Sequence, residues 1–177
     1  MDKDYGREQA ILQVNGIVQM VAALNVDYDH MDTLWHELEE VHGGAVTSLD
    51  FMAWCQDQLD SNQSTFEETI KEFLELREAA GDCESQDEAQ QQVQEDPLCI
   101  DVREPWHSIG EEGVTPDQFR IVLCTGGPHV EIQGDLDDHM QPDRVRIIYK
   151  DWGSNGELFD FDRDAVLRYC QQFYFGE

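Results

Sequence analysis

The spacing of the apolar residues changes at Pro97, and this change constrains the fold more than any other feature of the chain. Before Pro97 the apolar residues recur at intervals of three and four, the period of a helix that buries one face. After Pro97 they alternate with polar residues, as in strands that bury one face. Helices followed by strands predict an α+β protein, in which an N-terminal helical bundle precedes a small antiparallel sheet and a C-terminal helix.

Four helices are expected before Pro97, each with a stripe of apolar residues. Gly43 and Gly81 should end the second and the fourth, because glycine readily adopts the left-handed conformation that often follows a helix. Ser48 and the pair Ser64-Thr65 are candidate N-caps of the third and the fourth. The stripes span residues 11–24, 31–41 and 51–59, and the fourth consists of Phe66, Ile70, Phe73 and Leu74.

Residues 82–96 separate the helical pattern from the strand pattern. They hold one large apolar residue, Val93, among many glutamines and acids, so they should form a linker or an exposed helix. The predicted organisation is an acidic helical region at 1–81, this segment, and a sheet with a C-terminal helix at 97–177. The expected strands cover residues 98–102, 119–123, 130–132 and 145–149, and the last helix begins near Asp162.

The charge of the chain is strongly one-sided. Its net charge is −28, from 39 acids and 11 bases, and residues 8–70 contain no lysine or arginine. Ordinary surfaces mix both signs, because like charges on one helix repel each other. An apolar content of 40% still supplies a core, so the chain should fold. Such a surface should repel nucleic acid and anionic membranes and attract a cationic partner.

The cellular compartment is predicted from three observations. The five cysteines include no C-x-x-C pair, which favours reduced thiols buried as small apolar groups. No stretch of about 18 apolar residues exists, and the first residues lack the regions of a signal peptide. A cytoplasmic protein is expected, and for a phage-encoded protein this is the cytoplasm of the host cell. The oligomeric state stays open, with a homodimer possible.

No motif predicts catalysis, a cofactor or a metal. His36 is followed by an acid, but the zinc-protease motif also needs a histidine where Glu40 stands. Residues 125–128 (TGGP) lack the lysine and the helix of a phosphate-binding loop and should form a turn or bulge between strands. The aspartates of residues 134–143 do not follow the order of a calcium-binding loop and should form a charged hairpin turn.

The acids of the predicted helices are the candidate functional residues. Acids three or four positions apart on a helix lie about 5–6 Å from each other, the same order as the roughly 3.4 Å axial rise per phosphate along a DNA strand. A rigid acidic surface could therefore occupy a cationic groove built for nucleic acid. The expected partner-binding residues are Glu37, Glu40, Asp57, Asp60, Glu67, Glu68, Glu72 and Glu75.

Two resemblances accompany this pattern. In composition, size and the helical half free of bases, the chain resembles the acidic counter-defence proteins of phages and plasmids, which include DNA-mimicking antirestriction proteins and anti-CRISPR proteins. Residues 98–177 are similar to an uncharacterised family of small proteins of bacterial and mobile-element genomes, through the segments IVLCTGGPHVEIQGDL, RIIYKDWG and YCQQFYFGE. The first resemblance implies an inhibitor that binds a basic nucleic-acid-binding complex, such as a CRISPR effector or a restriction enzyme.

Two other functions fit the sequence. The chain could be an adaptor that docks through its C-terminal sheet, with Trp152 or the segment 173–175 (FYF) as an aromatic anchor. It could also be an acidic structural protein of a salt-adapted organism, which would agree with a total of three lysines. The unequal charge of the two halves is not needed for solubility and favours the inhibitor.

Overall fold

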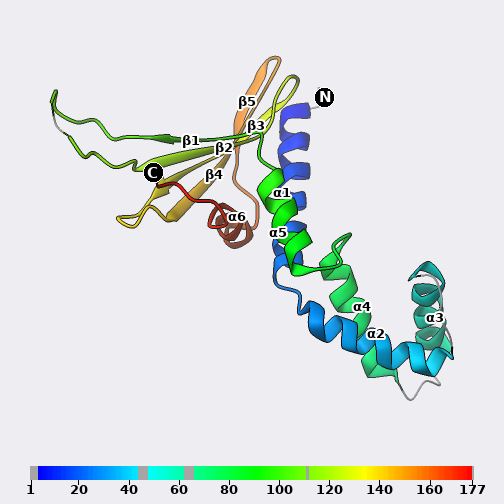
Figure 1. The fold of residues 1–177 in the computed structure, drawn as a ribbon. Coiled ribbons are helices and arrows are strands. Elements are labelled where there is room, and N and C mark those ends of the chain that lie inside the picture. Colours follow the sequence, from blue (N-terminus) through cyan, green and yellow to red (C-terminus); the bar gives the residue numbers. More distant parts are fainter. Residues whose placement is uncertain (1–3, 44–47, 62–65, 111, 177) are drawn as a thin grey trace. The chain divides into compact units, whose positions relative to one another are not determined.

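Figure 1 shows the computed structural model, which describes residues 4–43, 48–61, 66–110 and 112–176. Within these ranges the chain forms six helices and a five-stranded antiparallel sheet, which confirms the α+β class. The helices are α1 (Tyr5–Leu24), α2 (Tyr28–His42), α3 (Ser48–Ser61), α4 (Glu67–Ala80), α5 (Gln86–Glu95) and α6 (Arg163–Cys170), and the strands are β1 (Cys99–Arg103), β2 (Gln118–Cys124), β3 (His129–Leu136), β4 (Pro142–Asp151) and β5 (Ser154–Leu158).

Contacts divide the chain into two compact units. The helical unit comprises Ala22–Ala89, and the sheet unit comprises Met1–Val21 together with Gln90–Glu177. Most of α1 therefore groups with the sheet, and the boundary between the units falls inside α5. These limits differ from the ranges 1–81, 82–96 and 97–177, and that organisation stays a prediction.

The helical unit has an aromatic core. Phe51 of α3 is fully buried, with its ring centroid 4.2 Å from that of Trp35 in α2 and 5.7 Å from that of Phe73 in α4. The rings are tilted or edge-on, as the quadrupoles of aromatic rings favour. Further buried members of the same cluster are Val26, Met31, Leu34, Leu38, Cys55, Ile70 and Ala80.

The ends of these helices follow the sequence in part. Asp27 caps α2 by accepting a hydrogen bond from the backbone N–H of His30 (3.0 Å), and Gly43 ends the helix with a φ of 87°. Gly81 follows the last residue of α4, as predicted. The proposed cap at Ser64-Thr65 lies outside the described residues, as does the side chain of Ser48.

The expected burial of Phe66 is wrong. Phe66 is the N-cap residue of α4, so it precedes the first helical turn, and its side chain is 38% exposed. The remainder of the stripe agrees with the prediction, because Ile70 and Phe73 are buried and Leu74 packs against them.

The segment at 82–96 contains a helix, which is one of the two alternatives drawn from the sequence. Ala89 and Val93 of α5 are fully buried, whereas the glutamines between and beside them are exposed. A four-residue spacing of two small apolar side chains is enough to bury one narrow stripe of this polar helix.

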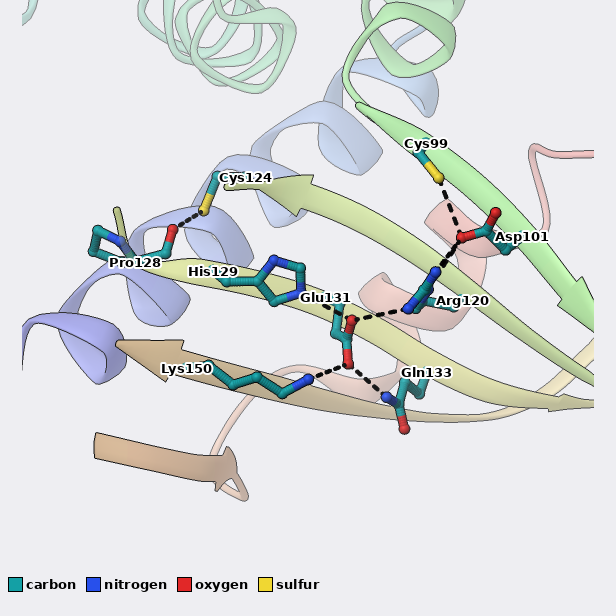
Figure 2. Close-up of polar contacts among 9 residues, drawn as sticks. All are labelled: Cys99, Asp101, Arg120, Cys124, Pro128, His129, Glu131, Gln133 and Lys150. Atoms are coloured by element: carbon teal, nitrogen blue, oxygen red, sulfur yellow. Dashed lines mark hydrogen bonds and ion pairs between the residues drawn. The ribbon is translucent and has the colours of Figure 1, made fainter. Parts of the chain in front are cut away.

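The sheet unit is built on strands that pair in chain order, β1-β2-β3-β4-β5. Large side chains of one face are buried: Ile121, Ile132 and Ile147 lie opposite one another across three strands. Phe119 lies against Gly134 in the same way, where any side chain at residue 134 would overlap the phenyl ring. The helices α1 and α6 lie behind the strands on this face in Figure 2, and α6 contacts β4.

Asp4 attaches the start of α1 to the sheet. Its carboxylate accepts hydrogen bonds from the hydroxyls of Ser154 (3.0 Å) and Tyr149 (3.3 Å) and from the backbone N–H of Arg7 (3.1 Å). The bond from the Arg7 N–H is the main reason why the pKa of Asp4 lies below its usual value. Gly6 follows closely, and the absence of a side chain there lets α1 approach the Tyr149 ring.

The sheet differs from the prediction at both edges. β5 was not expected, because its sequence SNGEL contains one apolar residue, Leu158, which is buried opposite Ile147. β1 was expected, but Ile100 and Val102 are partly exposed because β1 is an edge strand with a neighbour on one side only.

Candidate functional site

The eight acids predicted to bind a partner all lie on helices of the helical unit. All of them are exposed except Glu67, which is partly buried. They belong to α2 (Glu37 and Glu40), α3 (Asp57 and Asp60) and α4 (Glu67, Glu68, Glu72 and Glu75).

On α4 these acids form a row on the side turned away from the core. Glu68, Glu72 and Glu75 are spaced by four and three residues, whereas Ile70 and Phe73 face the core from the opposite side of the helix. Residues at these spacings are neighbours on a helix surface, at about 5–6 Å between their Cβ atoms. The row is therefore a line of negative charge in water.

Two acids of the set have a cationic or titratable partner. Lys71 donates a hydrogen bond to Glu67 within α4. His30 of α2 and Glu72 of α4 form a hydrogen bond of 2.9 Å between Nε2 and Oε1. This bond raises the pKa of His30 above its usual value, so Glu72 tends to hold a proton on the ring. The helical unit is still unbalanced, with 18 acids against Lys71 and Arg77.

The face of the sheet turned away from α1 and α6 carries a second group of charges, and we call it the open face. Alternating residues of each strand point to this face. One cross-strand row contains Asp101, Arg120, Gln133 and Arg146, a second contains Cys99, Val122, Glu131, Ile148 and Glu157, and a third contains Arg103, Gln118, Asp135 and Arg144.

Glu131 is the centre of the open face. It is a carboxylate that is only 1% exposed, although it lies on the face of the strands opposite to α1 and α6 (Figure 2). One carboxylate oxygen pairs with His129 Nε2 (2.9 Å) and lies 3.9 Å from Arg120, and the other accepts from Gln133 (2.6 Å) and Lys150 (3.4 Å). The long side chains around Glu131 thus exclude water from the carboxylate and supply its hydrogen bonds in place of water.

These partners keep Glu131 ionised. Burial alone raises the pKa of the carboxyl, but the hydrogen bonds from His129 and Gln133 and the charge of Lys150 outweigh it, so the pKa lies below its usual value. Both carboxylate oxygens are engaged, which leaves neither of them directed at a substrate. The cluster is therefore suited to fixing the positions of surrounding cations and not to proton transfer.

A second charge pair lies beside this centre. Arg120 donates to one oxygen of Asp101 through Nε (3.1 Å) and a terminal nitrogen (2.6 Å), and the Cys99 thiol donates to the same oxygen (3.2 Å). The bond from Arg120 is the main reason why the pKa of Asp101 lies below its usual value. The bond to Asp101 likewise raises the pKa of the Cys99 thiol, so this exposed cysteine is a poor nucleophile.

The segments that were not predicted to be catalytic or metal-binding motifs have structural roles. Residues 125–128 connect β2 to β3, as predicted, and a register shift lies just before them, between Val122 and Cys124 of β2. Asp137 accepts hydrogen bonds from the backbone N–H groups of His139 and Gln141 and holds the predicted hairpin turn between β3 and β4. His36 lies near Asp32 and Glu39 instead of Glu40. Among the described residues, no three histidines, cysteines or acids are arranged to hold a metal.

Reasoning from the sequence missed the open face. Its signal was present, because His129, Glu131 and Gln133 alternate with the buried Val130 and Ile132. Only the apolar half of that alternation entered the prediction. Strand pairing decides which polar residues lie next to one another, and it cannot be predicted from the sequence of a single strand.

Comparisons with protein-family models, curated protein sequences and solved structures found no match to this chain. In the part of the chain that the structure describes, no single helix is long and apolar enough to cross a membrane. The bent pair of α1 and α2, taken together, has the length and the composition to do so.

Proposed function

We propose that the protein is a non-catalytic acidic inhibitor that occupies the cationic nucleic-acid site of a host defence complex, either a CRISPR effector or a restriction enzyme. It acts in the cytoplasm of the host cell by mimicking the charge of a nucleic acid. It requires no cofactor, binds no nucleic acid itself, and does not act at a membrane. The binding surface is formed by the eight acids of α2, α3 and α4.

One observation carries this proposal: the exposed acids of the helical unit are supported by an aromatic core and are almost unmatched by bases. A rigid core holds the acids in position, so binding does not have to order them first. Many aligned charges also speed association with a cationic surface and make it strongly dependent on salt. A surface that only needed solubility would gain nothing from excluding lysine and arginine from α2 and α3.

The test is competition with nucleic acid. Labelled DNA bound to a purified CRISPR effector or restriction enzyme should be displaced by the protein at low salt and not at high salt. Reversing Glu68, Glu72 and Glu75 to lysine should slow association about tenfold or more, because steering by charge is lost. Reversing Glu37, Glu40 and Asp57 should act in the same direction.

A matched control is available in the sheet unit. Asp138, Asp143 and Asp160 are exposed, and their reversal to lysine changes the net charge by the same amount. Asp137 is left intact because it holds the β3–β4 turn. If the control triple abolishes binding and the helical triples do not, while circular dichroism shows all variants folded, the proposal is wrong.

A second candidate is an adaptor that binds through the sheet unit, and it rests on Trp152. This residue follows β4 in the turn before β5 and is 97% exposed, which is unusual for a tryptophan without a partner protein. Phe173 and Phe175, by contrast, are buried and cannot serve as anchors. Loss of a captured partner on Trp152→Ala, with no effect of the helical charge reversals, would favour the adaptor.

A further inference from the structure

A groove of about 350 Å³ lies on the open face of the sheet, within the sheet unit. Four adjacent strands line it: β1, β2 and β4 supply the charged side chains, and β3 lies between β2 and β4 and supplies an amide. Asp101, Arg120 and Gln133 line the groove and lie on the near side of the sheet in Figure 2. The other polar side chains that line it are Arg103, Gln118 and Arg146.

The charge of the groove is opposite to that of the chain. Among the residues that the structure describes, three arginines and one acid line the groove, in a protein whose net charge is −28. That acid, Asp101, is bound to Arg120 and does not neutralise the other two guanidinium groups. The lining therefore has an excess of two positive charges.

The arginines also retain unused donors. Arg146 is exposed and has no side-chain partner among the described residues. Arg103 donates to Gln118, which leaves other N–H groups of its planar fork available. Arg120 and Arg146 flank Gln133 in one cross-strand row, so their Cα atoms are about 10 Å apart, two strand spacings. A ligand above Gln133 is within reach of both side chains.

We propose that this groove binds a small molecule that carries a phosphate monoester. Such a group bears a charge of about −1.5 to −2 near pH 7, which matches the excess of the lining. Its oxygens suit the forked donors of arginine, which bind phosphate in pairs of parallel hydrogen bonds. A volume of 350 Å³ also has room for the organic part of a small metabolite. The net charge of the chain repels a long polyanion, which favours a small phosphorylated ligand over a nucleic acid.

Isothermal titration calorimetry on the full-length protein, in a buffer free of phosphate and sulfate, tests this site. AMP and inorganic phosphate should each bind saturably, and adenosine and succinate should not. Arg146→Gln should weaken AMP binding about tenfold, and Arg146→Lys should weaken it less, because lysine keeps the charge and loses the fork. Arg168→Gln, an exposed change on α6 outside the groove, should leave the affinity within about twofold.

Four results would overturn the site. The first is no saturable binding of either phosphate compound, and the second is adenosine binding as tightly as AMP. The third is succinate binding as tightly as phosphate, which would make the groove a general site for dianions. The fourth is an equal loss of affinity in Arg146→Gln and Arg168→Gln, with both variants folded. The helical acids do not take part, so this outcome is independent of the displacement of DNA.

Discussion

The helical unit and the open face of the sheet unit differ in whether their charged side chains are paired. In the helical unit the acids point into water with few partners, whereas on the open face acids and bases alternate across the strands and Glu131 is buried among cations. The net charge of −28 is thus an average over two different surfaces. The comparison shows that acidic composition alone does not identify a binding surface, because only unpaired charges remain available to a partner.

The largest effect that tests this difference should come from removing the buried carboxylate. Glu131→Ala leaves His129, Arg120 and Lys150 without their shared acceptor, and should lower the free energy of unfolding by about 1–3 kcal/mol. The loss stays below that for a fully buried pair, because the cations can turn toward water. Urea unfolding followed by circular dichroism measures it.

The matched control for Glu131 is an exposed acid of the helical unit. Glu68→Ala should change the free energy of unfolding by no more than about 0.5 kcal/mol, since Glu68 is exposed and its side chain has no hydrogen-bond or ion-pair partner among the described residues. Equal costs of the two substitutions would show that the two surfaces do not differ as described.

The two units should also respond to pH in opposite directions. The pKa of Glu131 is depressed, so its contribution to stability is present above its usual value of 4.5 and is lost as the pH falls through the lower folded value. The pKa of His30 is raised, so its contribution is present below its usual value of 6.5 and is lost as the pH rises through the higher folded value. Amide exchange measured at acidic and at alkaline pH can assign each loss to its unit.

Two neutral variants sharpen this test. Glu131→Gln should reduce the acid-side loss in the sheet unit, where Asp4 and Asp101 also have lowered pKa values. Glu72→Gln should remove the contribution of His30 to the alkaline loss in the helical unit. If either variant abolishes the loss in the other unit, the charges of the two surfaces are coupled and the comparison fails.

A smaller difference is expected from salt. Screening relieves repulsion over a Debye length of about 10 Å at 0.1 M, so added salt should stabilise the helical unit and change the sheet unit little. We expect the protein to be folded and cooperative in dilute buffer. Thermal unfolding at several sodium chloride concentrations checks this, and a chain that stays unfolded until molar salt is present would support the salt-adapted function instead.

The smallest effect concerns Cys99 on the open face. Its thiol is exposed, but the hydrogen bond to Asp101 raises its pKa and so lowers its thiolate fraction at neutral pH. Alkylation by iodoacetamide should therefore be a few times slower than for free cysteine, and Asp101→Asn should accelerate it. Mass spectrometry of the modified peptide gives the rate, with the buried Cys83 as the unreactive reference.

The sequence predicted the positions of the helices and strands better than the contacts between them. Periodicity located α2, α4 and most strands because a buried face imposes a spacing of 3.6 or 2 residues. β5 was not predicted because Leu158 is its one buried large side chain, and a single apolar residue defines no period. The grouping of α1 with the sheet includes the bonds of Asp4 to Tyr149 and Ser154, contacts between distant residues that no local pattern contains.

The candidate sites show the same limit. The acids of α4 were recognised because helical spacing alone sets which of them are neighbours. The groove on the open face was not, because Arg103, Arg120 and Arg146 are far apart in the sequence and meet only through strand register. A local interaction can be read from spacing, whereas a cross-strand interaction requires the pairing first.

The attachment of α1 by Asp4 also bears on the order in which the chain folds as it is made. The bonds of Asp4 to Tyr149 and Ser154 cannot form until residues 149 to 154 have left the ribosome. The residues of the helical unit, 22–89, are all synthesised before the first strand begins at Cys99. The helical unit can therefore complete its core before α1 can form its contacts with the sheet. The start of α1 is thus synthesised before the helical unit and attached after it.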